Sequence, residues 1–191
     1  MVIVSAENEP VRGHRELIIE KYLKKMGLNY KSNPVYCFLC KDYFVYGKRD
    51  MPPVCPIGNH KFVGRGEYCI PDFIITNPVY SPATSEYELY YYGRGSQKPK
   101  ATAVIMVNES IHYKNKRKMN QLAGQVKEFL DMGIAVFPLL EEEIDKASEL
   151  QLTGMMYYIS HAANNRTMFE YYKSSNEFKE KTSTFYERCG R

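Results

Sequence analysis

The chain has 191 residues, of which 44% are hydrophobic and 25% are charged. These are the proportions of a folded globular protein, and they exclude a disordered polyelectrolyte. Its formal net charge of +4 permits contact with nucleic acid but lies well below that of a dedicated polycation.

No apolar run approaches the ~20 residues that a membrane-spanning helix needs, so we expect no membrane partner. The first residues lack the basic and apolar regions of a signal peptide. The chain has five cysteines, and three of them have metal-ligand spacing. This pattern favours zinc in a reducing compartment over a disulfide framework, and it predicts a cytoplasmic protein.

The first predicted element is an amphipathic helix over residues 10–26. Apolar side chains recur there with a period near 3.6, Pro10 suits a first turn, and Gly27 suits a C-terminal stop. Residues 31–66 are instead rich in Cys, Pro, Gly and charge, with little periodicity. Such a segment buries little apolar area and needs a cross-link such as a metal ion to be stable, so we expect an irregular inserted module.

Four residues of this module have the types and spacing of zinc ligands. Cys37 and Cys40 are separated by two residues, which presents two thiolates on one tight turn, and Cys55 and His60 supply a second pair. A closed shell of four ligands leaves no position for water, so the prediction is a structural zinc site. Cys69 is an alternative to His60 as the fourth ligand.

Three strands are predicted after the module. Residues 68–76 form the first, which Asn77-Pro78 ends, and residues 86–92 alternate like a strand or one arm of a hairpin. A loop over residues 93–100 then leads to a continuous apolar run at residues 101–107, which is typical of a buried central strand.

A helix is predicted over residues 116–132, closed by Gly133, and a buried strand over residues 134–140. The succession of strand, helix and strand predicts a right-handed crossover with two parallel strands. From residue 141 onward the composition is helical. We expect this part to pack on the sheet or to mediate assembly.

Four short segments resemble a known family. They are Glu16-Leu-Ile-Ile-Glu to Asn29-Tyr30, Ile70-Pro71-Asp72-Phe73, Val104-Ile-Met-Val-Asn-Glu-Ser-Ile-His112, and Gly133-Ile-Ala-Val-Phe-Pro-Leu-Leu140.

Together with the element order, these segments resemble the PD-(D/E)xK nuclease superfamily, nearest to the branch of the very-short-patch repair endonucleases. The resemblance covers roughly residues 12–140. It implies an α/β fold with a mixed central sheet flanked by helices, a restriction-endonuclease-like core. The zinc-ribbon-like module at 31–66 would be inserted into this core at 1–140, and a C-terminal helical extension at 141–191 would follow.

The resemblance also implies an active site. Asp72 inherits the role of ligand to a catalytic Mg²⁺ or Mn²⁺, and Glu16 matches the acidic residue of the family's first helix. In the repair branch, an aspartate works with histidines from the turn after the next strand. On that pattern Asn108, Glu109 and His112 complete the site, with His112 as general base or metal ligand.

One departure from the family pattern leaves alternatives open. The family's strand glutamate falls on Met106, which cannot bind a metal ion. The turn after that strand could complete the site, Glu86 or Glu88 could supply the carboxylate, or the site could be inactive.

A basic run follows the turn, and its members are Lys114, Lys116, Arg117 and Lys118. Cations at the start of a helix oppose its dipole, so they suggest either phosphate contacts or an ordinary solvated face.

The expected function is a metal-dependent endonuclease that hydrolyses DNA and contains a structural zinc ion. Cutting both strands would favour a homodimer. The alternatives are a zinc-containing nucleic-acid-binding or assembly protein on a degenerate nuclease fold, and a purely structural protein.

Overall fold

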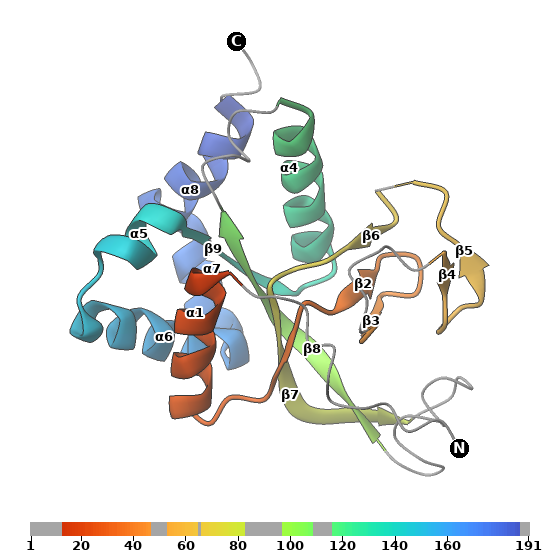
Figure 1. Ribbon diagram of the computed structural model, residues 1–191, viewed down its shortest axis with the longest axis horizontal. Helices are drawn as coiled ribbons and strands as arrows, with labels where there is room; N and C mark the ends of the chain where they lie inside the picture. The colour runs from red at the N-terminus through yellow and green to blue at the C-terminus, as the bar shows by residue number, and fades with distance from the viewer. Residues whose placement is uncertain (1–12, 47–52, 65, 83–96, 109–115, 188–191) are drawn as a thin grey trace.

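The computed structural model describes residues 13–46, 53–64, 66–82, 97–108 and 116–187 (Figure 1). A mixed four-stranded sheet lies at its centre, with the strand order β1-β7-β8-β9. Its strands are β1 (Tyr30–Ser32), β7 (Phe73–Pro82), β8 (Gln97–Asn108) and β9 (Ala135–Leu140). Strand β7 is antiparallel to both β1 and β8, whereas β8 and β9 are parallel. The predicted α/β fold with a mixed central sheet is confirmed.

Helix α4 (Lys116–Asp131) connects the two parallel strands, as predicted. Gly133, just after this helix, has a φ of 78°, a left-handed conformation that glycine adopts without steric cost. The chain then enters β9, whose residues pair with β8 from Ala103↔Ala135 to Asn108↔Leu140. The strand predicted at residues 134–140 is therefore present.

In the part of the chain that the structure describes, five helices cover one face of the sheet. They are α1 (His14–Lys25), α5 (Glu141–Lys146), α6 (Glu149–Asn164), α7 (Arg166–Ser174) and α8 (Asn176–Glu187) (Figure 1). The described part of the predicted first helix matches α1. Alternate strand side chains such as Phe73, Ile105 and Phe137 share one buried cluster with residues of these helices. The helices after residue 140 thus pack on the sheet and share its core.

The opposite face of the sheet packs against α4 and the inserted module. Ile74, Val104 and Val136 point to this side and form a second buried cluster with Phe129 of α4 and Tyr36 of the module. The rings of Tyr36 and Phe129 meet edge-on, with centroids 4.9 Å apart. The module is therefore attached to the sheet through an apolar layer.

The module extends to residue 69 instead of residue 66, and residues 31–32, expected in it, belong to the central sheet. It contains two small sheets and is more regular than its composition suggested. The first sheet has the order β3-β2-β6 and the second pairs β4 with β5. The strands are β2 (Val35–Cys37), β3 (Asp42–Phe44), β6 (Tyr68–Cys69), β4 (Val54–Cys55) and β5 (His60–Lys61). Short pairings of this kind carry no sequence period, so composition alone could not reveal them.

Three predicted strand boundaries are also wrong. The strand expected over residues 68–76 is two strands, because β6 pairs within the module and β7 joins the central sheet. Asn77-Pro78 does not end β7. Pro78 has no N–H to donate, and the strand accommodates it through the register shift between Asn77 and Tyr80. Residues 97–100, expected in a loop, begin β8.

Within the part of the chain that the structure describes, no helix combines the length and the apolar character needed to cross a membrane.

Candidate metal centre and candidate active site

Cys37, Cys40, Cys55 and His60 come together in the inserted module. Their sulfur and ring-nitrogen atoms all lie within 4.8 Å of one another. The Cys40 and Cys55 sulfurs are 3.7 Å apart, and the Cys37 sulfur is 3.3 Å from Nε2 of His60. Four ligands around a tetrahedral Zn²⁺ with Zn–S bonds of about 2.3 Å have neighbouring atoms about 3.5–3.8 Å apart. The cluster therefore has the donor set and the spacing to bind a metal ion such as zinc.

Local backbone geometry explains how each pair of ligands forms. Cys37 ends β2, and the backbone N–H of Cys40 donates to its sulfur at 3.4 Å, which closes the turn between them. Lys41 follows in a left-handed conformation with φ 55° and leads the chain away into β3. The second pair comes from a hairpin in which Cys55 lies directly opposite His60.

Gly58 lies in the turn of that hairpin, against the ligands. A Cβ atom added at this position would lie 2.6 Å from the Cys40 sulfur and 2.7 Å from Nδ1 of His60. Real Cβ contacts are not this short, so only glycine allows the hairpin to approach the first pair this closely.

Burial of the cluster favours neutral thiols in the absence of a metal ion. Burial, followed by the neighbouring Cys55, raises the pKa of the Cys40 thiol. Burial also raises the pKa of Cys37. Zinc binds thiolates, so a divalent ion at this site would supply the charge that deprotonation of these buried groups requires.

Cys69 is not among the clustered ligands of the described residues. It lies in β6, where it pairs with Tyr36, and its side chain is 2% exposed within the second buried cluster. Burial is the main reason that its pKa is raised, and the nearby carboxylate of Asp72 adds to the effect. Of the two alternatives for the fourth ligand, the structure brings His60 to the site.

Asp72 lies at the entrance to β7, beside the end of β8. Its Oδ2 accepts a hydrogen bond of 2.5 Å from the backbone N–H of Val107, and its carbonyl oxygen accepts one of 2.9 Å from Asn33. The pairing Phe73↔Ile105, continued by one residue, places Asp72 opposite Met106. A carboxylate at position 106 would therefore be its cross-strand neighbour.

Met106 fills this place with a buried thioether. Its side chain is 6% exposed and belongs to the second buried cluster, together with Val104 and Phe129. Burial among apolar groups explains why methionine is accommodated here, and it leaves Asp72 without a carboxylate neighbour at this position of β8.

The first turn of α1, which carries Glu16, lies at the same edge of the sheet. Arg15 contacts Glu141 at 3.0 Å and Asp145 at 2.6 Å, and both belong to α5, directly after β9. Strand β9 ends at Leu140, opposite Asn108 at the end of β8. The ends of β8 and β9, the start of α5 and the first turn of α1 thus meet at one edge, near Asp72 (Figure 1).

The other predicted active-site residues are placed only in part. Asn108 is the last residue of β8. Arg117 and Lys118 are exposed in the first turn of α4. Lys116 begins that helix. The remaining candidates lie outside the described residues, and they are Glu109, His112, Lys114, Glu86 and Glu88.

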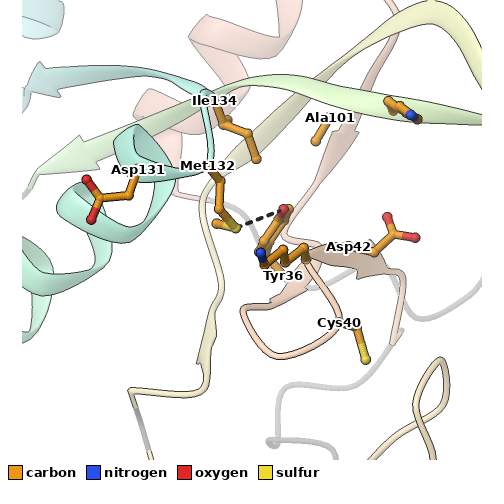
Figure 2. Close-up of a pocket in the computed structure, with 9 residues that line it drawn as sticks. Tyr36, Cys40, Asp42, Ala101, Asp131, Met132 and Ile134 are labelled. Atoms are coloured by element: carbon orange, nitrogen blue, oxygen red, sulfur yellow. Dashed lines mark hydrogen bonds between the residues drawn. The ribbon is translucent and has the colours of Figure 1, made fainter.

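A separate polar cavity of about 490 Å³ lies between the module and the sheet (Figure 2). Its lining includes the metal ligand Cys40, with Lys41 and Asp42 from the module and Lys100 from β8. Tyr36 reaches across it toward Met132, whose sulfur is 3.7 Å from the tyrosine hydroxyl. This contact adds to the apolar attachment of the module to the sheet.

Comparison of the chain with protein-family models, with curated proteins and with solved structures gave no match.

Proposed function

We propose that the protein is a metal-dependent endonuclease that hydrolyses DNA phosphodiester bonds and carries a structural zinc ion in its inserted module. The observation that supports this function best is the position of Asp72. Its carboxylate lies at a sheet edge where an antiparallel strand pair, a parallel crossover and the first turn of the first helix converge. The sequence resemblance assigns a catalytic metal ion to the same residue, and this supports the proposal.

In this proposal each candidate residue at the Asp72 edge of the sheet has its own role. Asp72 binds a Mg²⁺ or Mn²⁺ ion, which when bound would polarise the phosphate and make attacking water more acidic. One of its oxygens accepts a hydrogen bond from the backbone N–H of Val107, which orients the carboxylate. Glu16 and Glu109 add negative charge near the metal, Asn108 adds a neutral oxygen ligand, and His112 takes the proton from the attacking water.

The start of α4 would bind the DNA backbone. Arg117 and Lys118 are exposed in its first turn, directly after the segment that leaves the Asp72 edge. Together with Lys114 and Lys116 they would contact phosphates on either side of the scissile bond, which gives affinity without sequence preference. Cleavage of both strands would require two such sites, and a homodimer would supply them.

The test is cleavage of supercoiled plasmid with Mg²⁺ or Mn²⁺ and with an EDTA control. We expect Asp72→Asn to lower the cleavage rate at least ~100-fold, because a neutral amide binds these hard cations poorly. Asn is preferable to Ala here because its amide oxygen can still accept the hydrogen bond from Val107. Asp131→Asn, which changes an exposed carboxylate paired with Lys127, is the matched control. Equal cutting by Asp72→Asn and the parent would refute the proposal.

A second candidate function is nucleic-acid binding or assembly on a catalytically degenerate nuclease fold. It is favoured by Met106, which lies where a second carboxylate would face Asp72. Such a protein would retard DNA in a mobility-shift assay, with an affinity that falls as salt rises, but would not cut it. The same folded, zinc-loaded sample therefore separates the two functions.

A further inference from the structure

A second cavity, of about 360 Å³, lies between β9 and helices α6, α7 and α8, on the face of the sheet away from the zinc module. Its wall combines aliphatic and aromatic side chains, among them Leu139, Ile159 and Phe137, with a small number of polar groups. This size and this mixture are typical of small-molecule sites, in which apolar walls hold the ligand and a few polar groups orient it.

A buried lysine lies in the cavity wall. Lys181 is 6% exposed, and its ammonium group lies 2.9 Å from a carboxylate oxygen of Glu143 and 2.8 Å from one of Glu177. One cation between two carboxylates leaves the group with a net charge of −1. Lys181 is the only lysine in the described lining, and its charge is already neutralised. The excess negative charge would therefore repel an anionic ligand.

Tyr172 also lines this cavity. The residue as a whole is 6% exposed. A phenolic oxygen in a cavity wall can accept a hydrogen bond from a ligand N–H. Burial, and then the charges of Glu177 and Glu143, raise the pKa of Tyr172, so the hydroxyl stays protonated and neutral.

Aromatic rings lie around the Lys181 ion pairs and the Tyr172 hydroxyl. The Tyr172 ring stacks on Phe137 with centroids 5.5 Å apart, and Tyr158 meets it edge-on at 5.7 Å. Tyr171, which is 77% exposed, belongs to the same lining. The electron-rich faces of aromatic rings attract cations, above all ammonium ions that are partly removed from water.

We propose that this cavity binds a small organic ammonium ion with an apolar body. Its cationic group lies near Glu177 and the Tyr172 hydroxyl, and its apolar part lies against Leu139, Ile159 and Phe137. The site is distinct from the zinc ligands and from the Asp72 edge, so it does not depend on the nuclease proposal.

Three probes with the same phenyl group and different charge test the assignment by calorimetric titration of the full chain. They are phenethylammonium, the neutral 2-phenylethanol and the anionic 3-phenylpropionate. We expect phenethylammonium to bind at one site per chain, at least ~10-fold more tightly than the alcohol, with the anion weakest. Saturable binding that is equal for all three probes, or no saturable binding of the cation, would overturn the proposal.

Two variants locate the site. Glu177→Gln should weaken binding of phenethylammonium ~10-fold, and Tyr172→Phe, which removes only the hydroxyl, should weaken it several-fold. Glu142→Gln removes an exposed carboxylate that pairs with Lys146 outside the described lining, and it should leave binding unchanged. Thermal unfolding of each variant checks that it is folded. If folded Tyr172→Phe and Glu177→Gln bind the cation like the parent, the cavity is not its site.

Discussion

The side-chain amide of Gln125 donates a hydrogen bond to the backbone carbonyl of Tyr68, at 3.1 Å. Gln125 lies on α4 and is 6% exposed, whereas Tyr68 begins the last strand of the zinc module. Only three residues lie between Tyr68 and Asp72. This contact therefore fixes the point at which the module joins the candidate active-site edge.

Replacing Gln125 with Leu should destabilise the protein by about 1–3 kcal/mol, because the part-buried hydrogen bond to the Tyr68 carbonyl is lost. Urea denaturation measures this difference. Gln121→Leu, one turn earlier on the same helix and half-buried, is the control and should change stability much less. Equal effects of the two substitutions would show that the hydrogen bond contributes little.

The fourth zinc ligand can be identified by metal content. We expect the parent to bind one zinc ion per chain, His60→Ala to lose it, and Cys69→Ala to keep it, since Cys69 lies in the core outside the cluster. Loss of the metal should lower the thermal midpoint by about 10 °C, whereas removal of the Cys69 sulfur alone should cost only a few degrees. Retention of zinc by His60→Ala together with its loss from Cys69→Ala would reverse the assignment.

Gly58 offers a test of the module that leaves all four ligands in place. Gly58→Ala introduces a methyl group that would contact Cys40 and His60 at less than 3.0 Å, so zinc affinity should fall at least ~10-fold. Competition with a chelating dye measures it. Gly64→Ala is the matched control, because a Cβ there has no neighbour within 4 Å. A normal affinity in Gly58→Ala would mean that the hairpin can move away from the metal at little cost.

Met106→Glu would place a carboxylate opposite Asp72. Two adjacent carboxylates bind Mg²⁺ better than one, so we expect the variant to bind Mg²⁺ or Mn²⁺ more tightly and to cut plasmid faster than the parent. It should also be less stable at low metal concentration, because a charge then replaces a buried thioether. Met106→Gln has the same shape without the charge and should show neither metal effect.

The pairing of Arg15 with Asp145 predicts a small dependence of stability on pH. The hydrogen bond from Arg15 is the main reason that the pKa of Asp145 is lowered below its ordinary value. A carboxyl group with a lowered pKa in the folded state stabilises the protein above its unfolded pKa of about 3.9 and ceases to do so as pH falls through the folded value.

Asp145→Asn should therefore have a lower thermal midpoint than the parent at pH 7, and the gap should close as the pH falls below about 4. Thermal unfolding followed across this range by circular dichroism checks it. A gap that widens on acidification would contradict the assigned direction.

The elements with a strong period could be predicted from the sequence. The apolar stripe of residues 116–132 and the run at 134–140 correspond to α4 and β9, and the paired spacing of cysteines and histidine identified the metal cluster. Both signals are local, because a helix face or a turn with two thiols is encoded in a few neighbouring residues.

The division of residues 68–76 into two strands depends instead on partners far away in the sequence. Strand β6 pairs with β2, and β7 pairs with β8, so nothing within the segment itself marks the change at Ile70-Pro71 beyond a single proline. The burial of Met106 and of Tyr172 likewise follows from packing between distant elements, which no local pattern records.

The route of the chain also affects the order in which it can fold during synthesis. The zinc ligands lie within one short stretch, residues 37–60, so the metal centre can close as soon as that stretch has left the ribosome. Helix α1 precedes it, yet Arg15 pairs with a residue 130 positions later, and Ile19 and Leu23 share their core with Met156 and Ile159 of α6. The contacts of α1 with α5 and α6 can therefore form only after more than a hundred further residues have been added, and until then the surface that they cover stays exposed. Exposed apolar surface of this kind makes an incomplete chain prone to aggregation.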